Sequence, residues 1–418
     1  MNSAIAALIG LCISIVLIIK KISPVYSLIL GAIVGGLLAG WGLEQTVVEM
    51  VSGVKDITPA IVRILAAGVL TGMLVKTGSA ETIARSIIRA LGEKYIYLAL
   101  ALSAMLLTAM GVFIDVAVIT IAPIAIIMGS KLRLSKFKLL LAMIGGGKCG
   151  NILSPNPNTI IAAENFDAPL SSVMAAGVLP ALIGLAVTVF VIIPLIPKGD
   201  LMETDVVNDK DDNLPSLWRS LVGPIVTIVL LALRPIAGVV VDPMIALPVG
   251  GVVGIIATGH WKNMGTCLGY GLEKMSGIAI LLVGTGTLAG IIKASAIKDV
   301  LVGMLADWSN GGTFMAPIAG ALMSAATAST TAGATIASAS FADSIVAAGV
   351  AVVWGAAMVN AGATILDHLP HGSFFHATGG SVGMSIKERM KLIPYESLVG
   401  LLLTVLSLVS YLIVSYFI

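Results

Sequence analysis

Residues 145–159, which read GGGKCGNILSPNPNT, interrupt an apolar stretch of the chain. The two prolines remove backbone donors, and the glycines and asparagines permit non-helical turns. Apolar sequence continues on both sides of the break, so residues 136–161 predict a broken helix. Backbone of this kind is tolerated at membrane depth only where it lines a cavity or is buried in protein.

The composition of the whole chain places that break in a membrane. Of its 418 residues, 58% are hydrophobic and 11% are charged, and the mean hydropathy is +1.05. A soluble domain carries about 25% charged residues, so this chain cannot cover a soluble core. The net charge of +2 is too small to indicate a nucleic-acid partner. These values exclude a soluble enzyme and a nucleic-acid-binding module, and they predict a polytopic membrane protein.

Apolar stretches that could cross a membrane occur throughout the chain. One crossing needs about 20 apolar residues. Two amphipathic stretches, 43–56 and 79–93, interrupt the expected spans of the first half. The expected spans are 3–19, 23–42, 57–75, 136–161 and 171–196 in the first half, and 221–240, 244–260, 276–293, 344–366 and 393–417 in the second.

Two longer segments do not fit a single crossing. Residues 95–130 are apolar, are too long for one span, and hold TAMGVFID at 108–115 in their middle. Residues 312–342 are weakly polar and are centred on ATASTTAG at 326–333. We interpret each segment as a re-entrant helical hairpin, which dips into the membrane and returns.

The order of these features is the same in both halves, and a second polar break lies within 344–378. Inverted repeats with broken helices near the mid-membrane are typical of secondary transporters. A few identities, such as Gly53 with Gly271, recur at a constant offset. We therefore expect an all-α polytopic membrane protein of two inverted-topology repeats, each with five spans, a re-entrant hairpin and a broken helix. Their ranges are a first repeat over 1–197, a hydrophilic linker over 198–217 and a second repeat over 218–418.

The distribution of Lys and Arg predicts the orientation. Basic residues mark the cytoplasmic side of a cell (inner) membrane protein. Basic clusters at 131–138 and 387–391 lie on one expected side, together with the linker, whereas Lys55 and Lys293 lie on the other. We therefore expect both termini outside and the central linker in the cytoplasm.

Polar groups at the two hairpin tips and the two breaks form the candidate substrate site. Hydroxyl and amide groups, with nearby helix N-termini, can bind a carboxylate without a bare charge. Polar packing between helices is the alternative interpretation. The candidate residues for substrate binding are Thr108, Gly111, Phe113, Asn151, Ser154, Asn156, Thr159, Thr327, Ser329, Thr330, Thr331, His368, Gly372 and Ser373.

Asp115 is the sole carboxylate of the first hairpin. An acid at membrane depth indicates a functional site, and burial favours its protonated form. We predict that Asp115 carries a coupling proton, helped by His371. The alternative is a structural carboxylate that pairs with Lys148 or accepts hydrogen bonds from helix N-terminal amides.

An acid and three histidines lie close together in the second break, at 367–376. A zinc site needs ligands that are held in register. Pro370 and Gly372 break the helix that would align these ligands. We therefore expect no metal and no cofactor, and we leave open whether the histidines handle protons, contact substrate or are structural.

Three blocks of sequence carry a family resemblance. The first is FIDV at 113–116, followed by Pro123, and the second is GNILSPNPNT at 150–159. The third combines ATAS at 326–329 with His368 and the following GSF. Together they resemble the hairpin, loop and C-terminal blocks of the gluconate permease (GntP) family, in the ion transporter superfamily.

The resemblance implies a proton-coupled symporter of gluconate and related hydroxy acids, with hairpins that meet near the membrane centre and with frequent dimers. The expected partners are a small carboxylate, a proton, the lipid bilayer and a second copy of the chain. Where the family has Pro-Pro-His, this chain has Ser154, Pro155 and Asn156. Where the family has His-x-Asn-Asp, this chain has an HLPH sequence that begins at His368. These departures extend the candidate substrates to short hydroxy and dicarboxylic acids.

Two other functions remain open. Oxygens of Asn151, Thr159 and the second hairpin tip could bind sodium, because hard cations prefer oxygen ligands. The chain would then be a sodium-coupled carboxylate symporter. Alternatively, Asp115 and the buried histidines could serve a cation/proton antiporter. No nucleophile–base pair supports an enzyme.

Overall fold

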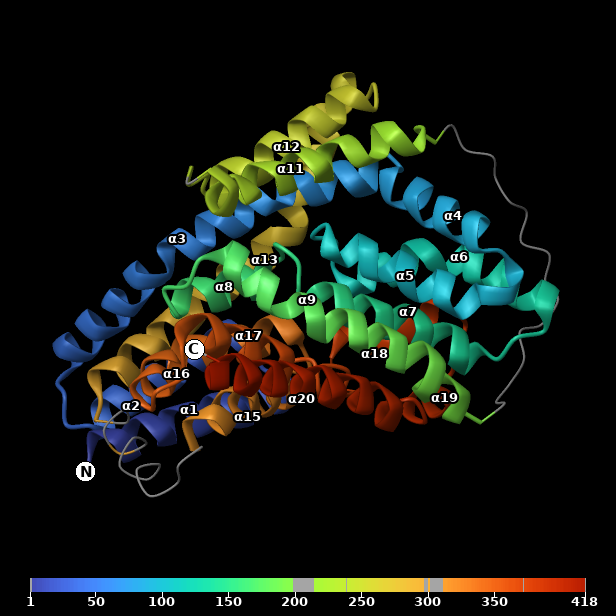
Figure 1. Ribbon diagram of the computed structural model, residues 1–418. Coiled ribbons are helices and arrows are strands. Elements are labelled where there is room, and N and C mark those ends of the chain that lie inside the picture. Colours follow the sequence, from blue (N-terminus) through green and yellow to red (C-terminus); the bar gives the residue numbers. More distant parts are fainter. Residues whose placement is uncertain are drawn as a thin grey trace.

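The computed structural model describes residues 2–197, 214–237, 239–296, 300, 311–370 and 372–417. Over these residues every regular element is a helix (Figure 1). The helices of the first half are α1 (Ser3–Ile19), α2 (Pro24–Leu38), α3 (Leu43–Lys76), α4 (Ser79–Leu91), α5 (Ile96–Ala109), α6 (Ile114–Leu132), α7 (Lys136–Asn151), α8 (Pro157–Asn165), α9 (Leu170–Val187) and α10 (Ile193–Leu195). Those of the second half are α11 (Leu217–Ala237), α12 (Pro243–Ala257), α13 (Met264–Ala294), α15 (Gly311–Thr327), α16 (Thr330–Ala347), α17 (Val352–Gly362), α18 (Ser373–Ser381), α19 (Ile386–Met390) and α20 (Ile393–Phe417).

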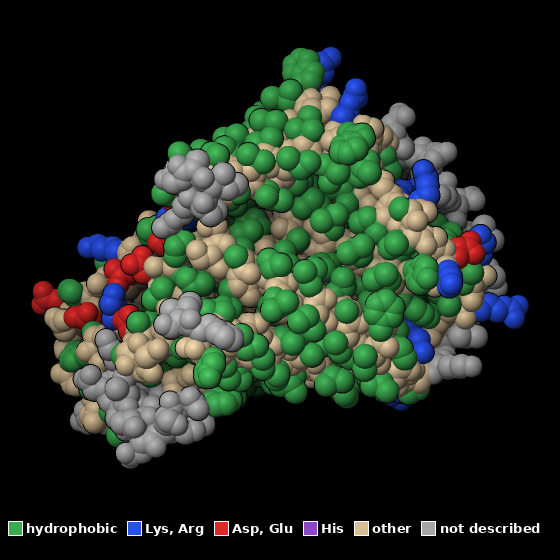
Figure 2. Space-filling view, in the orientation of Figure 1, with side chains coloured by type: hydrophobic (Ala, Val, Ile, Leu, Met, Phe, Trp, Pro, Cys, Tyr) green, Lys and Arg blue, Asp and Glu red, His purple; other side chains and the backbone are tan. Residues whose placement is uncertain are grey.

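The surface of the molecule is that of a multi-pass membrane protein. Among the described residues, five helices are long and apolar enough to cross a membrane, and a sixth is added if the bent pair of α4 and α5 counts as one span. Figure 2 shows a broad hydrophobic surface between two charged ends. Lys and Arg gather at the right and upper edges of that view, and Asp and Glu gather mainly at the left.

The long helices α3 and α13 cross at very close range. A methyl group at Gly53 would overlap the backbone of Gly286 and Gly290 on the other helix. A methyl group at Gly72 would overlap the backbone of Cys267 and approach that of Gly271. Glycines therefore allow the two backbones to touch, as small residues do between membrane helices. In Figure 1, α11 and α12 lie along α3.

Each half contains a helical hairpin that packs against a broken helix. The hairpin of α5 and α6 lies against α7, and Gly146 of α7 touches the backbone of Ala101. The hairpin of α15 and α16 lies against α17, and Gly362 at the end of α17 touches the backbone of Pro317. The tight hairpin tips require left-handed backbone, with φ of +94° at Gly111 and +47° at Ala328.

Some expected boundaries differ from the observed ones. The amphipathic stretch 43–56 is not separate, because it forms the first part of the continuous helix α3. The second hairpin extends past 342 to Ala347, and the next helix begins at Val352 rather than at 344. In contrast, the stretch at 79–93 is an amphipathic helix, α4, which turns by 109° into α5. Most of the linker 198–217 lies outside the described residues.

Candidate functional site

A cavity of about 330 Å³ lies where both hairpin tips and both breaks meet. Residues 113–116 contribute the first tip and residues 328–331 the second. Helix α13 closes one wall with Lys274 and Ile278. The complete lining is Phe113, Ile114, Asp115, Val116, Asn151, Lys274, Ile278, Ala328, Ser329, Thr330, Thr331, Asp367, Ser373 and Phe374.

Seven of the sixteen predicted binding and coupling residues thus line one cavity, although they come from four separate segments. They lie here because the helices end at the cavity: α6 and α16 begin at its edge, and α7 ends there. Helix ends leave backbone groups without intrahelical partners, which suits a polar ligand. The predicted residues that line the cavity are Phe113, Asp115, Asn151, Ser329, Thr330, Thr331 and Ser373.

The other described candidates lie behind the cavity wall. Thr108 donates a hydrogen bond to the carbonyl of Gly147 at 3.0 Å and so fastens α5 to α7. Asn156 caps α8 by accepting a hydrogen bond from the backbone of Thr159. These side chains hold the breaks in shape rather than face the cavity. The candidates that do not line the cavity are Thr108, Gly111, Ser154, Asn156, Thr159, Thr327, His368 and Gly372; His371 lies outside the described residues.

Asp115 stands in the first turn of α6, where the helix N-terminus favours a negative charge. Its carboxylate accepts a hydrogen bond from the backbone N–H of Val116 at 2.9 Å. No ion pair joins it to a cation among the described residues. Asp115 and Asp367 are the two acids of the cavity wall, and only Asp115 lacks a cationic partner there.

Lys148 forms its ion pair with Asp367 and not with Asp115. The Nζ atom of Lys148 lies 2.6 Å from Oδ1 of Asp367, and both side chains are almost completely buried. The hydroxyl of Thr330, at the second hairpin tip, donates to Oδ2 of Asp367 at 2.5 Å. One half of the chain therefore supplies the cation, and the other supplies the carboxylate and the hairpin tip.

A second buried ion pair lies next to this one. Arg389 donates to Glu396 through its two terminal guanidinium nitrogens, Nη1 and Nη2, and both side chains are buried. Oε2 of Glu396 lies 3.9 Å from Nδ1 of His368. The ring of His368 thereby joins the two ion pairs, since its Nδ1 also lies 3.0 Å from Asp367.

Three residues of this region escaped the sequence-based candidates for substrate binding and coupling. Asp367 was considered only as a metal ligand, Lys148 only as a partner of Asp115, and Lys274 not at all as a site residue. A usable signal was present: Lys148, just before the first break, and Asp367, in the second, are the only Lys, Arg, Asp or Glu residues of 145–159 and 361–376. Buried charges need partners, so two such residues predict a pair.

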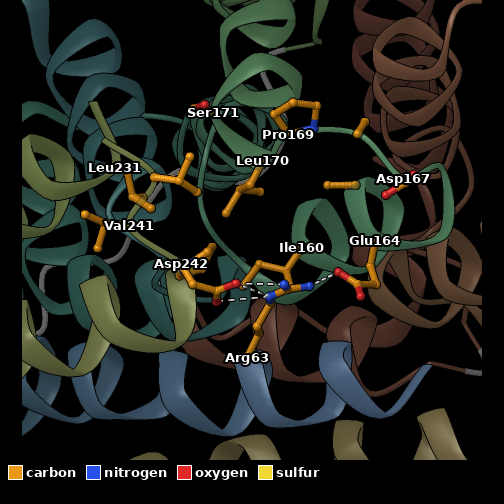
Figure 3. A pocket seen from close by; sticks show the side chains of 14 residues that line it. Arg63, Ile160, Glu164, Asp167, Pro169, Leu170, Ser171, Leu231, Val241 and Asp242 are labelled. Carbon is orange, nitrogen blue, oxygen red and sulfur yellow. Dashed lines mark hydrogen bonds and ion pairs between the residues drawn. The ribbon is translucent and has the colours of Figure 1, made fainter. Parts of the chain in front are cut away.

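A second cavity, of about 310 Å³, lies between α3, α8 and the start of α12. Figure 3 shows Arg63 between the carboxylates of Glu164 and Asp242, and Nη2 of Arg63 lies 2.7 Å from Asp242. The hydrogen bond from Arg63 holds the pKa of the Asp242 carboxyl below its usual value. Because its arginine is already matched by two acids, this cavity offers a weaker site for an organic anion.

The described residues contain no group of three or more His, Cys, Asp or Glu that could hold a metal ion. The chemistry available in the first cavity is therefore that of hydroxyls, an amide, a free carboxylate and an exposed ammonium. Such groups bind and orient a polar ligand and can exchange a proton with it.

Comparisons with known proteins agree with this description. Residues 3–417 match the family model of the GntP family permeases. An uncharacterized transporter of Haemophilus influenzae is 52% identical over 97% of both chains. A gluconate permease of Pseudomonas aeruginosa is 24% identical over 78% of both chains. A high-affinity gluconate transporter of Escherichia coli is 24% identical over 72% of this chain and 73% of that protein.

The fold is also similar to that of a solved transporter. The YdaH transporter of Alcanivorax borkumensis superimposes with a TM-score of 0.61 over 90% of this chain and 89% of that one, at 15% identity. The family match covers nearly the whole chain. The chain belongs to the GntP permease family, and it is a membrane transporter rather than an enzyme.

Proposed function

We propose that this protein is a proton-coupled symporter of a small hydroxy acid, such as gluconate or a related carboxylate, in the cell (inner) membrane. The observation that carries the proposal is the cavity at the hairpin tips, with its single unpaired acid, Asp115. The gluconate-transporting relatives support the substrate class.

The charges of the cavity explain how an acid and a proton would travel together. Asp367 is balanced by Lys148, which leaves Asp115 and Lys274 as the free charges of the wall. A substrate carboxylate adds one negative charge, and the ionised form of Asp115 repels it. Protonation of Asp115 removes that repulsion, so each ligand strengthens the binding of the other. His371 is proposed to assist this proton.

The hydroxyls of the second tip and the amide of Asn151 are proposed to bind the hydroxyl groups of the substrate. Ser329, Thr330 and Thr331 follow one another at the start of α16. Lys274 of α13 would attract the carboxylate across the cavity. The candidates behind the wall would hold the breaks in the binding geometry.

We also propose that the halves are inverted repeats, with the termini outside and the linker in the cytoplasm, and that the chain forms dimers. Gly53 and Gly72 of the first half correspond to Gly271 and Gly290 of the second, at one common offset. In the crossing of α3 and α13, Gly53 packs on Gly290 and Gly72 packs on Gly271. A twofold relation produces this reciprocal pairing, because equivalent patches face each other across the axis.

Uptake of radiolabelled acids into proteoliposomes tests the proposal. Gluconate, glycerate, lactate, citrate and succinate would be offered under an imposed pH gradient, with sodium or with choline. We expect one acid to accumulate in either cation, and a protonophore to abolish its accumulation. Asp115→Asn should remove proton-driven accumulation but keep exchange of the acid at equal concentrations.

The same assay identifies the rival functions. Accumulation that requires sodium and survives the protonophore would make the protein a sodium-coupled symporter. Proton release on addition of sodium, with no uptake of any acid, would make it an antiporter. Full proton-driven accumulation by the Asp115→Asn variant would refute the role of Asp115.

A further inference from the structure

Lys148 lies among groups that can accept hydrogen bonds from an ammonium. Its Nζ atom is buried and faces Oδ1 of Asp367 at 2.6 Å, the backbone carbonyl of Thr364, and Nδ1 of His368 at 3.2 Å. A protonated lysine has three N–H donors and no acceptor. The carboxylate of Asp367 and the carbonyl of Thr364 are acceptors, so the site suits the ammonium form of Lys148.

The ring of His368 lies between the ion pair of Lys148 and Asp367 and the beginning of α20. Its Nε2 lies 3.1 Å from the carbonyl oxygen of Ile393, which can only accept, so Nε2 is the donor. Ser397 lies 3.2 Å from the same nitrogen. Nδ1 lies 3.0 Å from Oδ1 of Asp367 and 3.2 Å from Nζ of Lys148, so the ring contacts both members of the ion pair.

The remaining charges around Asp367 are balanced as well. On α20, Glu396 is paired with Arg389, which also donates to Thr378 at 3.2 Å. On α16, Thr330 contributes a neutral hydroxyl to Asp367. Among the described residues the cluster therefore consists of two buried ion pairs that His368 joins, and Asp367 has a cationic partner while Lys148 is present.

We infer that Lys148 is a positioning residue that keeps Asp367 ionised and thereby reserves proton exchange for Asp115. The inference rests on the proposed function and adds a number to it: one proton accompanies each monocarboxylate, and transport moves no net charge. Asp367 lines the cavity together with Asp115, so without Lys148 the site would contain two acids able to take up protons.

Two single variants with opposite expected behaviour test this role. In Lys148→Met, Asp367 becomes a buried acid without a cation, and its neutral form is favoured. We expect uptake relative to wild type to fall by about tenfold or more between about pH 6 and pH 9, as that proton is lost. In Asp367→Asn the unpaired group is a cation, so relative uptake should instead fall as the pH is lowered.

The double variant Lys148→Met/Asp367→Asn supplies the rescue. It restores a neutral site, so its uptake relative to wild type should be independent of pH and should exceed that of both single variants at their unfavourable pH. Lys76→Met removes an exposed lysine whose charge faces the ring of Tyr270, and it should introduce no new pH dependence. Size-exclusion profiles of all variants report folding, and the Asp367→Asn arm carries the test if Lys148→Met does not fold.

Three results would overturn the inference. One is a pH profile of Lys148→Met that matches that of wild type, and another is a double variant no more active than the single ones. The third is a wild-type ratio of two protons per monocarboxylate, measured with an internal pH dye beside the radiolabel. Absence of any acid uptake by wild type would instead remove the proposed function itself.

Discussion

Both breaks interrupt a helix at the cavity, but one contains only neutral polar groups and the other contains a charged one. The break between α7 and α8 contains neutral amides, and its Asn151 lines the cavity. The break between α17 and α18 contains an ionised acid, Asp367, at the corresponding place in the cavity wall. An amide can satisfy itself locally, whereas a buried carboxylate needs a counter-ion.

This difference explains which contacts stay within one half and which cross between halves. Ser154 and Asn156 both donate to the backbone carbonyl of Asn151, within five residues of it. Asp367 obtains its cation from Lys148, 219 residues away. The polar groups of residues 151–156 therefore bond to one another, and Asp367 ties the two halves of the molecule together at the cavity.

The largest loss of stability should come from removing the carboxylate of the charged break. Asp367→Ala leaves Lys148 buried without its carboxylate, which should cost about 3–5 kcal/mol of stability. Thermal unfolding in detergent, followed by tryptophan fluorescence, measures the loss. The double variant with Lys148→Met should recover most of it. A smaller loss for Asp367→Ala than for Asn151→Ala would contradict the comparison.

Substitutions at the hairpin contacts should have the next largest effects and should be similar in the two halves. Gly146→Ala and Gly362→Ala each place a methyl group against the backbone of a hairpin helix. We expect each to destabilise the protein by about 1–3 kcal/mol, as overpacking does. Gly269→Ala is the control, because open space surrounds that position. Unequal losses of stability would show that the two hairpin contacts do not contribute equally to the fold.

The amide contact between the breaks should contribute less. Asn158 donates to the side-chain oxygen of Asn360 at 2.6 Å, and both residues are buried. Asn158→Ala should cost about 1–2 kcal/mol, because a neutral hydrogen bond is lost and one amide is left unsatisfied. A double-mutant cycle with Asn360→Ala isolates the coupling between the two side chains. A coupling as large as that of Lys148 with Asp367 would erase the distinction between neutral and charged contacts.

The smallest effect should come from the partly exposed charges of the second cavity. Arg63→Gln should cost less than about 1 kcal/mol, because solvent screens its pair with Asp242. The pKa of Asp242 is lowered in the folded protein, so the contribution of the pair is present at neutral pH. It should disappear as the pH falls through that lowered value, and unfolding measured along an acid titration tests this. An equal deficit at all pH values would show that packing, not charge, is responsible.

Much of the architecture could be predicted because it depends on local chemistry. The helix is interrupted between Asn151 and Pro157, within the expected stretch 145–159 and at its prolines, whereas the glycines of 145–150 stay helical in α7. The two hairpins likewise turn at the predicted tips, since only short polar or glycine-containing segments interrupt long apolar runs. The continuity of α3 through 43–56 was missed, because the sequence does not show that Asp56 of this stretch pairs with Lys293 of α13.

The partners of the buried charges could not be predicted in the same way. Nearness in sequence suggested Asp115 as the partner of Lys148, yet the ammonium lies on Asp367. The same limit applies to the candidate site: the sequence indicated the four segments that line the cavity, but it did not separate Thr330, on the cavity wall, from Thr108, which fastens two helices.

The amino-acid sequence alone was enough to predict a helical membrane transporter with two hairpins and two polar breaks. Composition and helix-breaking residues act locally, so they need no knowledge of the neighbours. Only the tertiary structure decided which acid is free and which is paired. A carboxylate and an ammonium 219 residues apart interact only when the helices bring them to 2.6 Å, and the unpaired Asp115 is defined by that choice.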